Sequence, residues 1–104
     1  MEIIDKEKYE ALAEKFQREH VDRLKQTLSK FGVGHTVAKE ICGEFSFELS
    51  RLFDQGELTL EKEIFRPVVA FTSDEETFFV QPASVAFHEY VFGTVADAYD
   101  GTAG

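Results

Sequence analysis

The sequence contains no tryptophan, two prolines and a single cysteine, Cys42. One cysteine cannot form an intramolecular disulfide, which fits a reducing compartment, so we expect a cytoplasmic protein. The first residues lack the basic start and long apolar run of a secretory signal. No segment approaches the roughly 20 apolar residues that a membrane span needs. We therefore expect neither secretion nor membrane insertion.

Positive charge is scarce in the second part of the chain. Residues 1–39 carry eight Lys/Arg against seven Asp/Glu, whereas residues 40–104 carry three Lys/Arg against thirteen Asp/Glu. The last cation is Arg66. A dense negative surface repels nucleic acid and anionic membranes, so neither is expected as a partner. A basic partner protein remains compatible with this charge, and so does a self-repelling monomer.

The length of 104 residues predicts one domain, with residues 101–104 as a frayed tail. Apolar residues make up 43% of the chain, enough for a packed core. Eleven phenylalanines predict that this core is largely aromatic and that some rings are left for an interface.

Two stretches show the apolar periodicity of helices. The first covers residues 5–31, with Asp5 as N-cap and Gly32 as terminator. The second covers residues 36–55 and stops at Gly56. Its expected core face is formed by Val37, Ala38, Ile41, Phe45, Leu49, Leu52 and Phe53. The connection between the two stretches is short, which favours an antiparallel helix pair.

Residues 57–81 change to a period of two, which is typical of strands. Residues 58–64 alternate as in a half-buried strand, and residues 68–72 and 77–80 flank a polar turn as in a hairpin. Pro82 can start a last helix over residues 83–99, which is apolar nearly all round and so either central or covered by another chain. The fold class is therefore α+β, in the order α-α-β-β-α. An all-α fold remains open if residues 57–81 are partly helical.

The second helix carries a candidate protein-binding site. Glu40, Glu44 and Glu48 recur every four residues and form one acidic ridge, with Phe47 beside it. Charge that steers and an aromatic ring that anchors suit the recognition of a basic surface. The alternative is a solvated helix face whose Phe47 is covered by the hairpin or the tail.

No other residues form a chemical motif. His20, on the apolar stripe of the first helix, is expected to be a packed core or boundary histidine, and Cys42 a small buried hydrophobe. The segment starting at His88-Glu89 lacks the second histidine of a zinc-protease motif. We expect no catalytic residues, no metal and no cofactor.

Three functions remain. The leading hypothesis is a small acidic protein-binding module, such as an inhibitor, an immunity-type neutraliser or an adaptor, that occludes a basic surface of its partner. The second is a structural or assembly protein whose function is its homo-oligomer. The exposed sheet edges and the apolar last helix favour a homodimer over a monomer. The third is an enzyme or small-ligand binder with a pocket between hairpin and helices, where His20, His88 and Glu89 are the first residues to suspect.

Overall fold

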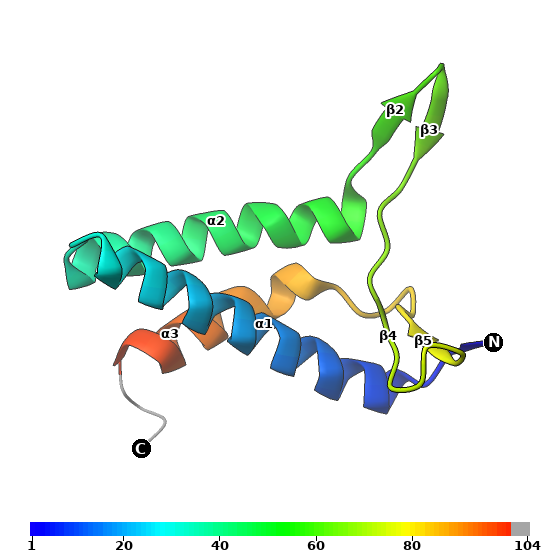
Figure 1. Ribbon diagram of the computed structural model, residues 1–104, viewed down its shortest axis with the longest axis horizontal. Coiled ribbons are helices and arrows are strands. Elements are labelled where there is room, and N and C mark those ends of the chain that lie inside the picture. The colour runs from blue at the N-terminus through cyan, green and yellow to red at the C-terminus, as the bar shows by residue number, and fades with distance from the viewer. Residues whose placement is uncertain (101–104) are drawn as a thin grey trace.

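The computed structural model describes residues 1–100 and has the α+β organisation that the sequence predicts (Figure 1). Three α-helices form the body, and short strands lie at one end of it. The helices are α1 (Lys6–Lys30), α2 (His35–Gln55) and α3 (Val91–Asp100), with a 3-10 turn η1 (Phe87–Tyr90) leading into α3. The strands are β1 (Glu2–Ile3), β2 (Leu58–Leu60), β3 (Glu63–Phe65), β4 (Ala70–Phe71) and β5 (Phe78–Val80). The predicted tail, 101–104, lies outside the described residues.

Helix α1 begins and ends where its capping residues predict, and α2 ends where Gly56 predicts. The Asp5 carboxylate accepts a hydrogen bond from the backbone N–H of Lys8 at 3.1 Å, as an N-cap does. Gly32 follows α1 with a φ of +77°, a left-handed conformation that glycine adopts without a steric cost. At the other end of α2, the N–H of Gly56 still donates to the carbonyl of Leu52, and the helix stops there.

The predicted hairpin after residue 68 is confirmed as β4 and β5, which pair antiparallel. Strand β1 was not predicted, and it adds to the other edge of β5 in parallel. A two-residue strand has no readable period, and β1 is held by its partner rather than by its own pattern. This small sheet packs at the N-terminal end of α1 (Figure 1).

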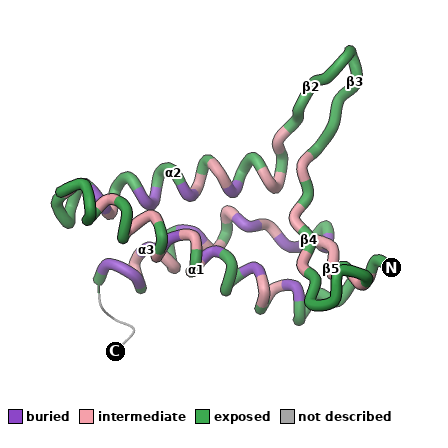
Figure 2. Tube along the Cα trace, viewed as in Figure 1, coloured by how far each residue is buried: buried purple, intermediate pink, exposed green. Residues whose placement is uncertain are grey.

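The expected single strand over residues 58–64 is wrong, because the chain reverses within it. Glu61 and Lys62 both have positive φ, and this turn joins β2 to β3 in a second hairpin. Every residue of β2 and β3 is exposed, so the predicted half-burial is also wrong. The hairpin projects from the end of α2 as an arm (Figures 1 and 2).

The last helix begins later than predicted. Residues 83–86 form no helix, and the helical turn starts at Phe87 instead of directly after Pro82. The cause is a tertiary contact, because the Asp54 carboxylate at the end of α2 accepts the backbone N–H groups of Phe87 and His88 at 2.8 and 2.9 Å. A cap supplied from another helix leaves no mark in the local sequence.

The face of α2 that packs into the protein differs from the predicted one. Small residues are buried on it, namely Ala38, Cys42, Gly43, Ser46 and Ser50. Larger side chains of the predicted face remain partly exposed, including Val37, Ile41, Phe45 and Leu52. Small residues let α1 and α3 approach α2 closely. In the seam between α1 and α2, the buried hydroxyl groups of Ser46 and Ser50 are hydrogen-bonded to His20 and Gln17.

The core consists of two clusters of buried side chains. One joins all three helices and is formed by Val21, Ala38, Cys42, Val91, Val95, Ala98 and Tyr99. The other lies near the sheet and is formed by Tyr9, Ala13, Val85 and Phe87. Within residues 1–100, no helix is long and apolar enough to cross a membrane.

Candidate functional site: a groove between α2 and α3

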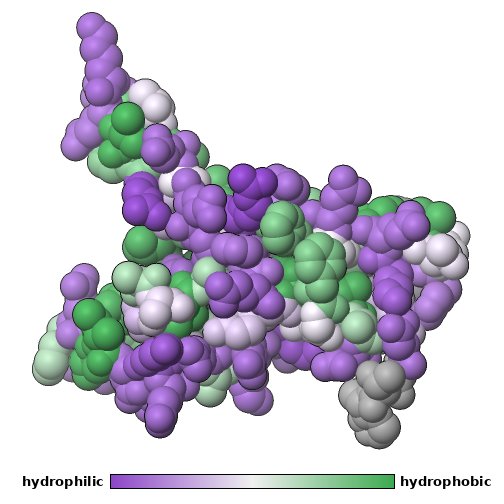
Figure 3. Space-filling view, turned by 180° about the vertical axis from the view of Figure 1, so that it is seen from behind, coloured by the Kyte–Doolittle hydropathy of each residue, from purple (hydrophilic) through white to green (hydrophobic). Residues whose placement is uncertain are grey.

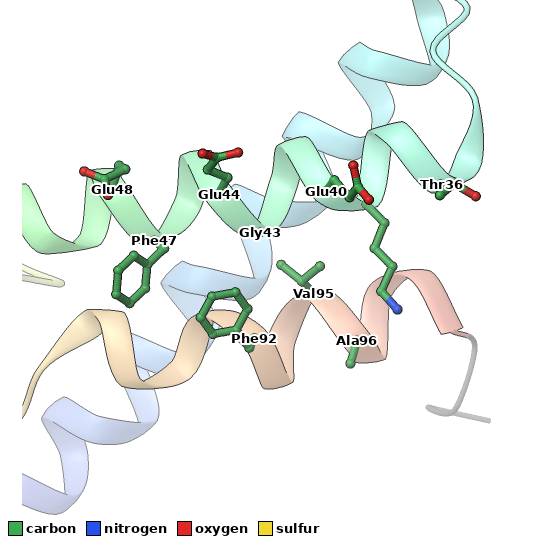
Figure 4. A pocket seen from close by; sticks show the side chains of 10 residues that line it. Thr36, Glu40, Gly43, Glu44, Phe47, Glu48, Phe92, Val95 and Ala96 are labelled. Carbon is green, nitrogen blue, oxygen red and sulfur yellow. The ribbon is translucent and has the colours of Figure 1, made fainter.

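Helices α2 and α3 enclose an open groove of about 890 Å³ (Figure 4). Its lining brings the whole predicted site together with part of α3. The lining residues are Thr36, Lys39, Glu40, Gly43, Glu44, Phe47, Glu48, Phe92, Val95 and Ala96. The acidic ridge forms one edge of the groove along α2, and the apolar side chains lie between the two helices (Figure 4). The result is an apolar floor with an acidic rim.

The rim carries charge that is little compensated. Within the described part of the chain, neither Glu40 nor Glu44 forms an ion pair, and Glu48 has only a loose contact with Arg51 at 3.7 Å. Lys39 also lines the groove, but its ammonium group is bound to Asp100 at 2.9 Å. Because the lysine is neutralised by its partner, the groove is left with a net negative charge.

Two stacked rings form the floor. Phe47 of α2 and Phe92 of α3 lie with ring centroids 5.5 Å apart and planes at 29°. Phe47 is half-buried, whereas Phe92 remains 62% exposed. From the back of the molecule, apolar surface is visible in the middle of the body, beside hydrophilic side chains (Figure 3). An exposed phenylalanine held by a second ring is a preformed apolar contact point.

Gly43 lines the groove and lies next to the Phe92 ring. The residue is buried in α2, and a Cβ atom placed there would lie 3.6 Å from the Phe92 ring, which is ordinary van der Waals contact. The Phe92 ring therefore lies over Gly43, beside the acidic rim, with room for a methyl group between the ring and the glycine.

A buried carboxylate supports the aromatic floor from one end. The Asp54 side chain is 5% exposed, and its Oδ2 accepts a hydrogen bond from Nδ1 of His88 at 2.7 Å. A carboxylate can only accept, so Nδ1 carries the proton. The His88 ring in turn stands edge-on to Phe47, with centroids 5.7 Å apart. Asp54, His88, Phe47 and Phe92 thus form a continuous row of contacts.

Every hydrogen bond of Asp54 is structural. Its two oxygens accept from the backbone of Phe87 and His88, from Nδ1 of His88 and from Nε2 of Gln81 at 3.0 Å. Burial acts to raise the pKa of Asp54, but these hydrogen bonds outweigh it and lower the pKa below its ordinary value. The carboxylate is therefore ionised and joins the end of α2 to η1.

The residues of the ligand-pocket hypothesis are not brought together. His20 is bonded to Ser46 through Nε2 at 2.8 Å, and burial lowers its pKa. The described contacts of His88 include no hydroxyl or thiol that could act as a nucleophile, and Glu89 is exposed. A second hollow of about 520 Å³ lies beside Asp54 and His88, where all acceptor positions of the carboxylate are used.

Cys42 is buried, as predicted, with its sulfur 3.1 Å from the Tyr99 hydroxyl. Burial raises the pKa of the thiol, although the Tyr99 hydrogen bond acts in the opposite direction. Among residues 1–100, no three His, Cys, Asp or Glu side chains are grouped so that they could hold a metal ion.

Sequence reasoning found the rim and Phe47 but missed Phe92, His88 and Asp54 as parts of the site. Phe92 did give a signal, because it lies outside the face of the last helix that Phe87, Val91, Val95 and Ala98 share. The Asp54–His88 contact joins residues 34 apart in the chain and has no local signature.

Comparison of the chain with models of known protein families, with curated proteins and with solved structures finds no match. Its function therefore has to be inferred from the geometry.

Proposed function

We propose that this protein is a small binding module that holds a basic, amphipathic helix of a partner protein in the α2–α3 groove. One observation carries the proposal: the acidic ridge and the exposed Phe92 line the same groove, so charge and apolar contact face one ligand. Helix-in-groove recognition uses this combination of apolar anchors and flanking charge. The module would act by covering the basic surface of its partner.

The size of the site sets the length of the bound segment. Glu40 and Glu48 are eight residues apart on α2, which corresponds to about 12 Å along the helix axis. A bound helix would contact the rim over about two turns. Lysine or arginine residues at i, i+4 and i+8 would match the spacing of the three carboxylates, and an apolar side chain beside them would reach Phe92.

The overall charge favours such a partner. The net charge of −9 creates a field that attracts a cationic segment before contact and speeds association. The apolar floor then has to supply most of the lasting affinity, because exposed charge pairs contribute little. The lone buried cysteine is consistent with action in the cytoplasm, where we expect the partner.

The test uses a model peptide, a leucine–lysine amphipathic helix of about five turns with one tryptophan on its apolar side. The protein has no tryptophan, so the emission reports the peptide alone. We expect saturable one-to-one binding with a blue shift of the emission. Phe92→Ser should weaken binding at least tenfold, and replacing all three rim glutamates by glutamine should weaken it by about as much at low salt.

Matched controls separate the groove from general charge. Glu14, Glu19 and Glu57 are exposed and lie outside the groove, so their joint replacement by glutamine removes the same charge. This control variant should change the affinity less than threefold. Equal weakening by the rim and control variants, or equal binding of a scrambled peptide of the same composition, would overturn the proposal.

A further inference from the structure

Apart from the hydrogen bond of Arg66 to Asp54, the arm, residues 57–66, receives little support from the rest of the described chain. Its strands β2 and β3 pair only with each other, and all their residues are exposed (Figure 2). An isolated two-stranded hairpin is marginal in water even when its strands are longer. Its turn adds a cost, because Glu61 and Lys62 adopt the left-handed conformation that glycine or asparagine normally supplies.

The exposed side chains of the arm are mostly apolar on one side. Leu58 pairs with Phe65 and Leu60 pairs with Glu63, so three apolar side chains and one carboxylate point to one side of the hairpin. The three apolar side chains are 45–65% exposed. Ile64 on the other side is also exposed. A protruding hairpin with this composition is a surface that needs a partner.

A second unpartnered surface lies on the body, and we call it the α1–α2 face. It consists of Phe16, Ile41, Phe45 and Leu52, which are 37–52% exposed. Ile41, Phe45 and Leu52 follow one row of α2, and the Phe45 ring reaches across to His20 of α1 with centroids 6.1 Å apart. This face borders the acidic ridge at Glu48, which lies three residues after Phe45 and four before Leu52. Phe47, on the floor of the groove, points about 160° away from Phe45 around α2.

We propose that a second copy of this chain covers both surfaces, with the arm of each copy packed on the α1–α2 face of the other. Within one chain the two surfaces cannot meet, because the arm points away from the body (Figure 1). A two-fold axis would satisfy both surfaces of both copies at once, as in isologous dimers. A hydrogen bond holds the base of the arm against the end of α2, since Arg66 donates to the carbonyl of Asp54 at 2.8 Å.

The exposed apolar area favours a second copy. Eight partly exposed apolar side chains on the arm and the α1–α2 face present on the order of 800 Å² per copy, which is what one partner contributes to a stable interface. Each surface also carries an acidic side chain: Glu63 pairs with Leu60 on the arm, and Glu48 lies between Phe45 and Leu52 on α2. The acidic groove is suited to a cation and not to another acidic chain.

Sedimentation equilibrium at high micromolar concentration tests this proposal. We expect a dimer whose association strengthens with salt, since salt screens the repulsion between two chains of charge −9. Peptide binding in the groove should weaken with salt, so the two interactions are separable. Leu60→Lys on the arm and Phe45→Glu on the α1–α2 face should each give a monomer, and an equimolar mixture of the two should recover dimer.

Phe92→Ser is the matched control, because it removes an equally exposed apolar side chain from the groove. It should leave the dimer intact while weakening peptide binding at least tenfold, and Leu60→Lys should prevent dimerisation while leaving peptide binding unchanged. A wild-type monomer at this concentration, or a dimer that survives both single substitutions, would overturn the proposal. A mixture without dimer would show that arm meets arm or face meets face, which also overturns it.

Discussion

The His88 ring stands edge-on to the Phe47 ring, with centroids 5.7 Å apart and planes at 85°. Because Nδ1 of His88 is bonded to Asp54, this contact joins a buried carboxylate to the floor of the groove. Asp54 is thus a positioning residue for Phe47, although it does not line the groove itself.

We therefore expect His88→Ala to weaken binding of the amphipathic peptide by about three- to tenfold, because edge-to-face ring contacts contribute roughly 0.5–1.5 kcal/mol. His88→Phe keeps a ring against Phe47 and should retain more of the affinity. Titration of the peptide fluorescence with both variants measures this difference. Equal affinity of wild type and His88→Ala would show that the contact does not position the floor.

Asp54→Asn should destabilise the fold by about 2–4 kcal/mol, because an amide retains one acceptor oxygen where the carboxylate had two and bonds to an ionised group are strong. Since the pKa of Asp54 is lower in the folded protein, its ionisation stabilises the fold above about pH 4, and this contribution is lost as the pH falls through the lowered value. Urea unfolding between pH 5 and pH 2 should therefore show a shallower acid loss for Asp54→Asn. Parallel curves for both proteins would contradict this role.

The burial of His20 leads us to expect a second dependence of stability on pH, at higher pH than that of Asp54. Burial lowers its pKa, so on acidification the unfolded chain takes up a proton before the folded protein does. Stability should decline as the pH falls below about 6.5, the ordinary value for histidine. His20→Gln should remove that part of the decline in urea unfolding. If the variant keeps the wild-type slope, His20 is not protected from protonation.

Cys42 should be inert in the native protein. Its thiol is buried and its pKa is raised, so the reactive thiolate is scarce at neutral pH. We expect Ellman's reagent to react slowly under native conditions and at once in denaturant. Fast reaction in the native state would mean that the cluster around Cys42 opens readily.

Gly43→Ala should stabilise the protein by about 0.5–1 kcal/mol, because glycine is a poor residue inside a helix. The added methyl group meets the Phe92 ring at an ordinary contact distance, so no clash opposes the gain. Thermal or urea unfolding measures the change. Destabilisation would show that the packing between α2 and α3 is tighter than this contact indicates.

The sequence predicted what is local in this fold. The caps at Asp5 and Gly56 and the hairpin of β4 and β5 all follow from patterns within a few residues. The acidic ridge belongs to the same class, because i, i+4 spacing on a helix fixes one edge regardless of what packs against the rest. The structure then places Phe47 beside it in one groove.

What the sequence did not predict depends on contacts distant along the chain. The late start of the last helix is set by Asp54, more than thirty residues away. The buried face of α2 was misplaced because small residues such as Ser46 and Ser50 pack inside through hydrogen bonds, while Phe45 stays outside. A rule that places large apolar residues inside misses a polar seam of this kind.

The most direct test of the groove is a heteronuclear NMR titration with the leucine–lysine peptide, since every backbone amide reports separately. We predict that the shifts concentrate on the groove residues of α2 and α3 and disappear with Phe92→Ser. Shifts spread evenly over all acidic residues, or unchanged by that substitution, would contradict a binding site between α2 and α3.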